Sequence, residues 1–183
     1  MLIAQQKLQE NIAEYILYMY QLEDVVRAFQ FDTDRLMDQF VLPQLKNPSF
    51  ETQYREWYGA LVKKMINQRL EKSGHLAELN DILVELSYLH NMLINAANDE
   101  KYKQLFTTAL PFIEEFKERS NLKDKNEIEV MFHAMYMKML LKLRKKEISN
   151  ETEQAFDSMR ILLAYLSKRY HEMKNGTLNF WNN

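Results

Sequence analysis

Glycine and proline are scarce in this chain of 183 residues, which contains only three of each. These residues form most tight turns, so a β-rich fold, which needs many turns, is disfavoured. The phosphate-binding patterns G-x-x-x-x-G-K and G-x-G-x-x-G are absent, and so is the G-x-S-x-G turn of serine hydrolases. The scarcity therefore predicts an all-α protein without a glycine-rich phosphate-binding loop.

Helical periodicity and capping residues divide the sequence into segments that are joined by short connections. Such connections make consecutive amphipathic helices antiparallel neighbours in a bundle. We predict a single domain, an antiparallel bundle of six to seven helices over residues 1–176, followed by a short tail over residues 177–183. The expected helices span about 4–29, 32–43, 47–73, 75–97, 99–120, 126–146 and 150–176.

Several of these boundaries depend on capping residues and prolines. Asn47 precedes Pro48, and a proline at the first helical position loses no hydrogen bond. Asn150 and Glu153 have the spacing of a capping box. Pro111 lies inside the segment 99–120, so we expect that helix to be kinked or split there.

The composition describes a soluble globular protein. Hydrophobic residues make up 46% of the chain, which is ample for a core, and the net charge of -2 argues against a nucleic-acid partner. The longest apolar run without a charge, "YILYMYQL", is far shorter than the roughly 20 residues of a membrane span. There is no cysteine and no signal-peptide pattern, so we expect a cytoplasmic protein that does not enter a membrane.

Residues 11–29 of the first expected helix carry three acids, and the helical periodicity predicts which one faces the core. Glu14 falls on a polar stripe with other charged residues, and Asp24 lies beside that stripe. Glu23 falls on the opposite, apolar side, where Arg27, one turn later, is its expected partner. The sequence therefore predicts that Glu23 is a buried acid.

Two other polar residues lie on apolar helix faces. His90 lies in the middle of the leucine face of the segment 75–97, and Arg69 shares a side with Tyr58 and Val62. Because buried charges require partners, we predict an internal cluster of Glu23, Arg27 and His90, joined by Arg69. Such a cluster forms either a ligand-binding pocket or a structural network that fixes helix register, and we favour the structural interpretation.

Metal binding and RNA cleavage are weaker alternatives. Glu129 and His133 lie one turn apart but form a single pair, whereas helical di-iron sites need paired Glu-x-x-His motifs, so we expect no metal and no cofactor. Arg69 and His75 have the Arg-x5-His spacing of helical ribonucleases of the HEPN type, although Leu70 replaces the usual polar residue. The basic run "KMLLKLRKK" complements the dipole at a helix C-terminus or forms a small anionic-ligand patch.

The methionine residues and the C-terminal tail are two features that could form contacts with another protein chain. Four of the 11 methionines cluster in the segment 126–146, where core packing is the expected role. An exposed methionine-rich face there would instead indicate a protein interface. The tail contains Leu178, Phe180 and Trp181, which we expect to fold back onto the bundle or to dock on a neighbouring subunit.

The N-terminal run "IAQQKLQENIAEYILYMYQLEDVVRAF" resembles the opening of a bacterial family known only as domain of unknown function 4924. Its specific pieces are "ENIAEY" and "QLEDVVRA", and Tyr20 stands where that family leads us to expect a tryptophan. Family members have about the length of this chain. The resemblance implies a cytosolic helical protein without an assigned activity, so it carries over no catalytic residue.

The sequence contains no complete catalytic set, and this favours a non-enzymatic interaction or scaffold module. We expect self-association, with another protein as the alternative partner. The rival function is a small-ligand-binding protein or enzyme with Glu23, Arg27, Arg69 and His90 at its site. A weaker rival is an RNA-binding or RNA-cleaving helical domain that uses Arg69 and His75.

Overall fold

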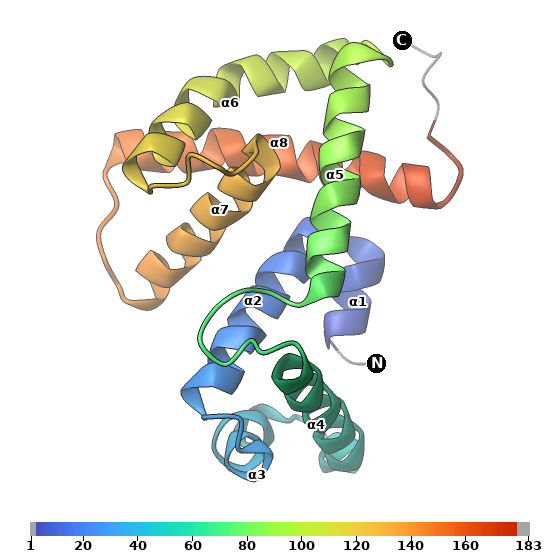
Figure 1. Ribbon diagram of the computed structural model, residues 1–183, viewed down its shortest axis with the longest axis vertical. Helices are drawn as coiled ribbons and strands as arrows, with labels where there is room; N and C mark the ends of the chain where they lie inside the picture. Colours follow the sequence, from blue (N-terminus) through green and yellow to red (C-terminus); the bar gives the residue numbers. More distant parts are fainter. Residues whose placement is uncertain (1–2, 179–183) are drawn as a thin grey trace. The chain divides into compact units, whose positions relative to one another are not determined.

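The computed structural model describes residues 3–178, and within that range the chain is all-α, as predicted (Figure 1). The helix count differs, because residues 3–178 contain eight α-helices instead of the predicted six to seven. They are α1 Ile3–Glu10, α2 Ile12–Ala28, α3 Thr33–Leu36, α4 Glu51–Asn67, α5 Ala77–Asn95, α6 Glu100–Arg119, α7 Glu127–Leu143 and α8 Asn150–Lys174.

The chain forms two compact units. The first unit comprises the chain up to Gln6 together with Tyr18–Asp81, and the second comprises Lys7–Leu17 together with the chain from Ile82 onward. None of the helices in residues 3–178 combines the length and hydropathy needed to cross a membrane.

The additional helix results from a break at Asn11, inside the expected helix 4–29. The Asn11 side chain accepts hydrogen bonds from the backbone amides of Ala13 at 3.0 Å and Glu14 at 3.2 Å. It therefore caps the start of α2 in the way that short polar side chains compete with continuous helix. A single asparagine among good helix formers was too weak a signal to predict this break.

In the first unit, an irregular segment joins α3 to α4. It consists of a π-helix over Met37–Val41, a 3₁₀ turn over Leu42–Gln44 and a second 3₁₀ turn over Pro48–Phe50. Asn47 caps that second turn by accepting from the Ser49 amide at 3.0 Å, which confirms the predicted Asn-Pro start of the following helix.

Helix α4 ends at Asn67, about six residues before the predicted end near Ser73. The next residues form a Schellman motif: the amide of Leu70 donates to the carbonyl of Met65, and Arg69 adopts the left-handed conformation with φ +58°. Glycine usually occupies the left-handed position of this motif, but arginine occupies it here. The sequence therefore carried no helix-stop signal near Asn67, where α4 ends.

In the second unit, α8 packs against both α6 and α7 (Figure 1). We expected a kink or a split at Pro111; helix α6 continues through that residue as one helix, so it is not split there. The cap of α8 is Ser149, whose hydroxyl accepts from the Thr152 amide, and the predicted Asn150 cap was therefore one residue late. Leu178 is half-buried, whereas Phe180 and Trp181 lie outside the described residues, and the tail boundary stays a prediction.

Candidate functional site

Glu23 is fully buried in the first unit, which confirms the prediction that it is the acid facing the core. One carboxylate oxygen lies 2.6 Å from Nδ1 of His75, and the other accepts from the Leu76 amide at 2.8 Å. The ring of Tyr20 stacks on the His75 imidazole with centroids 3.6 Å apart and an interplanar angle of 15°. The carboxylate therefore anchors the segment that leads into α5.

His75 is the partner that sequence reasoning missed. It precedes α5 and lies 52 residues from Glu23 in the chain, so no helical periodicity connects the two. Only the general rule that a buried carboxylate requires a partner could have suggested a search among the histidines. Tyr20, at the position where the resemblance leads us to expect a tryptophan, supplies an aromatic face for that histidine.

Arg27 does not pair with Glu23, and that part of the expected cluster was wrong. Its guanidinium donates to Asp24 at 2.8 Å, to the carbonyl of Leu70 at 3.0 Å and to the carbonyl of Gly74. The long Arg27 side chain reaches the carbonyls of Leu70 and Gly74, whereas the Glu23 side chain is buried in the core. Arg27 therefore stabilises the connection between α4 and α5.

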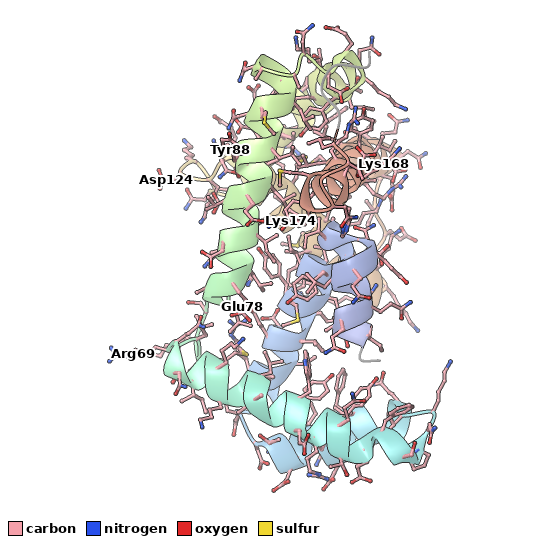
Figure 2. The ribbon with its side chains drawn as sticks, turned by 90° about the vertical axis from the view of Figure 1, so that its right-hand side faces the viewer. Arg69, Glu78, Tyr88, Asp124, Lys168 and Lys174 are labelled. Carbon is pink, nitrogen blue, oxygen red and sulfur yellow. The ribbon has the colours of Figure 1, made fainter. Side chains whose placement is uncertain are left out.

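Arg69 is exposed, so its expected burial with the cluster was also wrong. The helical wheel that placed it on an apolar face no longer applies beyond Asn67, where α4 ends. Figure 2 shows its side chain projecting away from the end of that helix.

His90 is buried in the second unit, as its place on an apolar face predicted. Its Nδ1 lies 2.7 Å from the Tyr102 hydroxyl, and the rings of Tyr102 and Phe106 meet it edge-on. Burial lowers the pKa of His90 below its ordinary value, against a small opposing effect of Glu127. His90 is therefore a neutral core histidine at pH 7. The predicted ligand-binding role of Glu23, Arg27, Arg69 and His90 stays a prediction.

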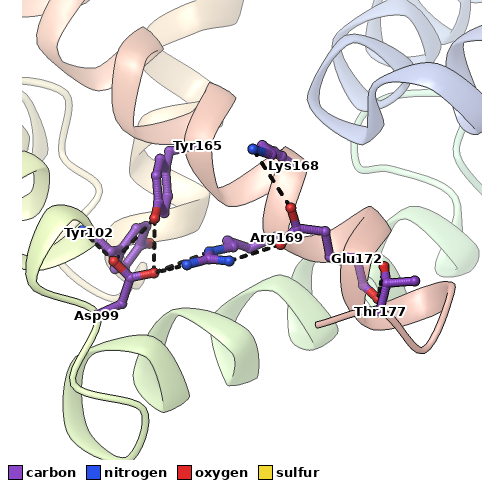
Figure 3. Close-up of polar contacts among 7 residues, drawn as sticks. All are labelled: Asp99, Tyr102, Tyr165, Lys168, Arg169, Glu172 and Thr177. Carbon is purple, nitrogen blue, oxygen red and sulfur yellow. Dashed lines mark hydrogen bonds and ion pairs between the residues drawn. The ribbon is translucent and has the colours of Figure 1, made fainter. Parts of the chain in front are cut away.

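A second buried carboxylate, Asp99, joins α6 to α8 (Figure 3). It caps α6 by accepting from the Tyr102 amide at 3.0 Å. Both of its oxygens accept from the Tyr165 hydroxyl at 3.1 and 3.0 Å, and Arg169 donates to one of them from Nε at 3.1 Å and Nη2 at 2.7 Å. Nη1 of the same guanidinium donates to the Glu172 carboxylate at 2.9 Å.

This network determines the charge of Asp99. Burial alone raises the pKa of Asp99, but the Tyr102 amide, the Arg169 guanidinium and the Tyr165 hydroxyl together lower it below its ordinary value. Asp99 is therefore ionised at pH 7 and fully hydrogen-bonded. The sequence marked Asp99 only as a helix boundary, since its partners lie 66 and 70 residues away.

The second unit also carries a surface groove of about 680 Å³, lined by the start of α2, the second half of α7 and the middle of α8. We call it the methionine groove. Its apolar lining is Ala13, Leu17, Met135, Met139, Leu143, Leu163 and Ala164, and its polar lining is Asn11, Glu14, Lys138, Lys142, Asp157 and Arg160. Charges of both signs therefore surround an apolar floor.

Lys138 is the buried charge at the edge of the methionine groove. Its ammonium lies 2.6 Å from Glu153 and 3.3 Å from Asp157, both on α8. Asp157 in turn accepts from Arg160 at 3.1 Å. Part of the basic run that suggested an anionic-ligand patch is thus neutralised by α8.

The buried side chains of Glu23, His90 and Asp99 each have hydrogen-bond partners, and the methionine groove combines an apolar lining with charges of both signs. Among residues 3–178, no three histidine or acidic side chains gather closely enough to hold a metal ion. These features define an all-α protein with buried polar networks in its core.

The family model described as Domain of unknown function (DUF4924) matches residues 1–177, and the chain belongs to that family. The N-terminal resemblance thus extends over nearly the whole chain. No curated protein and no solved structure matches it.

Proposed function

We propose that the protein is a non-enzymatic cytoplasmic interaction module that self-associates through the methionine groove. The observation that carries the proposal is the apolar lining of the groove, in which Leu143 and Ala164 are exposed and the other apolar residues are partly or fully buried. Leu143 has 62% of its surface exposed at the end of α7, next to the adaptable side chain of Met139. Methionine side chains adapt to varied partner surfaces, and an apolar lining with a polar rim is typical of protein interfaces.

The charges at the rim favour a second copy of the chain as the occupant. Lys142 and Arg160 supply positive charge, and Glu14 and Asp157 supply negative charge. In a two-fold symmetric contact the same surface meets itself, so each copy offers acids to the bases of the other. A strongly basic or strongly acidic partner would meet charges of its own sign at this rim.

The environment of His90 supports the non-enzymatic part of the proposal. An acid–base catalyst needs access to its substrate and a pKa near the working pH. His90 is buried between aromatic rings, its Nδ1 is engaged by Tyr102, and burial favours its neutral form. These contacts are those of a residue that positions α5 against α6.

Native mass spectrometry and light scattering of the full chain would test the proposal. Leu143→Glu places a carboxylate in the groove and should convert the oligomer to a monomer while the helical circular dichroism is unchanged. Tyr88→Glu is the matched control, because Tyr88 is 67% exposed on α5 of the same unit and outside the groove (Figure 2). A wild-type protein that is monomeric at high concentration, or equal effects of the two variants, would contradict it.

A further inference from the structure

The first unit contains a separate pocket of about 520 Å³, a volume within the range of small-molecule sites. Its walls come from Ile3 at the start of α1, from α2, from the irregular segment between α3 and α4, and from α4. The three tyrosines in its lining are Tyr18, Tyr54 and Tyr58, and the two phenylalanines are Phe40 and Phe50. The lining is therefore dominated by aromatic rings, which stack favourably on a planar ligand.

Two of the phenols in this pocket affect one another's pKa. Tyr18 and Tyr58 both line the pocket, and Tyr58 is buried. Burial raises the pKa of both hydroxyl groups, so both remain neutral at pH 7. The inner wall consequently presents rings and neutral hydroxyls instead of charge.

The backbone beside the pocket has an unusual conformation. The π-helix Met37–Val41 closes with the Leu42 amide donating to the Met37 carbonyl, and two of its residues, Phe40 and Val41, line the pocket. π-Helices are rare, and they occur frequently at functional sites. The Gln44 side chain donates to the Phe40 carbonyl at 2.7 Å and so holds the π-helix to the following turn.

The polar part of the pocket lies at Lys46, which follows this turn. Lys46 is exposed, forms no ion pair with any residue of 3–178, and is the one charged residue in the lining. The neighbouring polar groups are the amides of Gln21, Gln44 and Asn47. A site with one cation, no acid and several rings matches a ligand with aromatic rings and a single negative charge.

We propose that this pocket binds a small planar aromatic molecule carrying one carboxylate, with its rings against the phenylalanines and tyrosines and its carboxylate at Lys46. The site lies wholly within the first unit, so it is independent of the methionine groove and of self-association.

The experiment is calorimetric titration of the full chain with a naphthoate and with the corresponding uncharged naphthamide. Saturable binding of the naphthoate is expected. Lys46→Gln should weaken naphthoate binding about threefold, the size of a partly exposed ion pair, and leave naphthamide binding unchanged. Lys72→Gln is the charge control, because Lys72 is exposed in the same unit and outside the pocket.

A second pair of variants tests the aromatic wall. Phe50 is 41% exposed, so Phe50→Ala should fold, and it should weaken both probes about fivefold. Ile66→Ala is the control, since Ile66 is 45% exposed on α4 and does not line the pocket. Failure of the naphthoate to saturate, or equal effects of Phe50→Ala and Ile66→Ala, would overturn the site. Equal effects of Lys46→Gln on both probes would overturn the carboxylate assignment.

Discussion

Replacing Asp99 should destabilise the protein in two separable steps. Asp99→Asn keeps a side-chain acceptor for the Tyr102 amide but removes the charge that faces Arg169. Asparagine caps helices about as well as aspartate, so this variant keeps the cap and removes the ion pair together with its hydrogen bonds from Arg169. Asp99→Ala removes the cap, the acceptor for Tyr165 and the charge together.

The size of each step follows from the contacts. Removing one partner of a buried ion pair costs about 3–5 kcal/mol of the free energy of unfolding. Arg169 is only partly buried and keeps Glu172, so we expect about 2 kcal/mol for Asp99→Asn. Loss of the cap adds about 1 kcal/mol in Asp99→Ala. A total of about 3 kcal/mol corresponds to a fall in Tm of about 6–12 °C for a chain of this size.

Urea unfolding followed by circular dichroism would measure both free energies, provided that the denaturant dependence is equal in all variants. Asp124→Asn is the control, because Asp124 is exposed in the loop before α7 (Figure 2) and should change stability by less than about 0.5 kcal/mol. If Asp99→Asn costs no more stability than Asp124→Asn, the network in Figure 3 does not stabilise the fold.

Three further predictions concern pH, a helix end and the core histidine. The pKa of Asp99 is lowered on folding, so its ionised carboxylate stabilises the folded state above the unfolded pKa of about 4. This stabilisation is lost as the pH falls through the folded pKa. Asp99→Asn should therefore make the free energy of unfolding, measured by urea titration, depend less on pH on the acid side. Arg69→Gly should raise the free energy of unfolding by about 1 kcal/mol because glycine tolerates the left-handed conformation, whereas a similar gain from Arg69→Ala would contradict this cause. His90→Leu leaves the buried Tyr102 hydroxyl without its partner and should lower the free energy of unfolding by about 1–3 kcal/mol. Adding Tyr102→Phe should recover part of that loss in a double-mutant cycle. Strictly additive losses from the two substitutions would contradict a stabilising hydrogen bond.

Helix ends show where prediction from sequence succeeded and failed. The Asn47–Pro48 start carries its signal in two adjacent residues, and the structure confirms it. The end of α4 has no such signal, because Arg69 occupies a position where glycine is usual. Lys145 after α7 and Asn121 after α6 are further non-glycine residues in the left-handed conformation. A chain with three glycines thus ends several helices with other residues, and of these Arg69 and Lys145 carry no helix-stop signal, whereas asparagine at 121 is a known alternative to glycine.

Sequence patterns alone were enough to predict the all-α class, the buried position of Glu23 and the apolar environment of His90. These properties follow from periodicity within one helix, where neighbours are three or four residues apart. Tertiary structure alone decided that Glu23 meets His75 and that Asp99 meets Arg169, because these partners lie 52 and 70 residues apart. A buried carboxylate must have a partner, but which one it has depends on how the helices pack, and packing depends on contacts that no local pattern records.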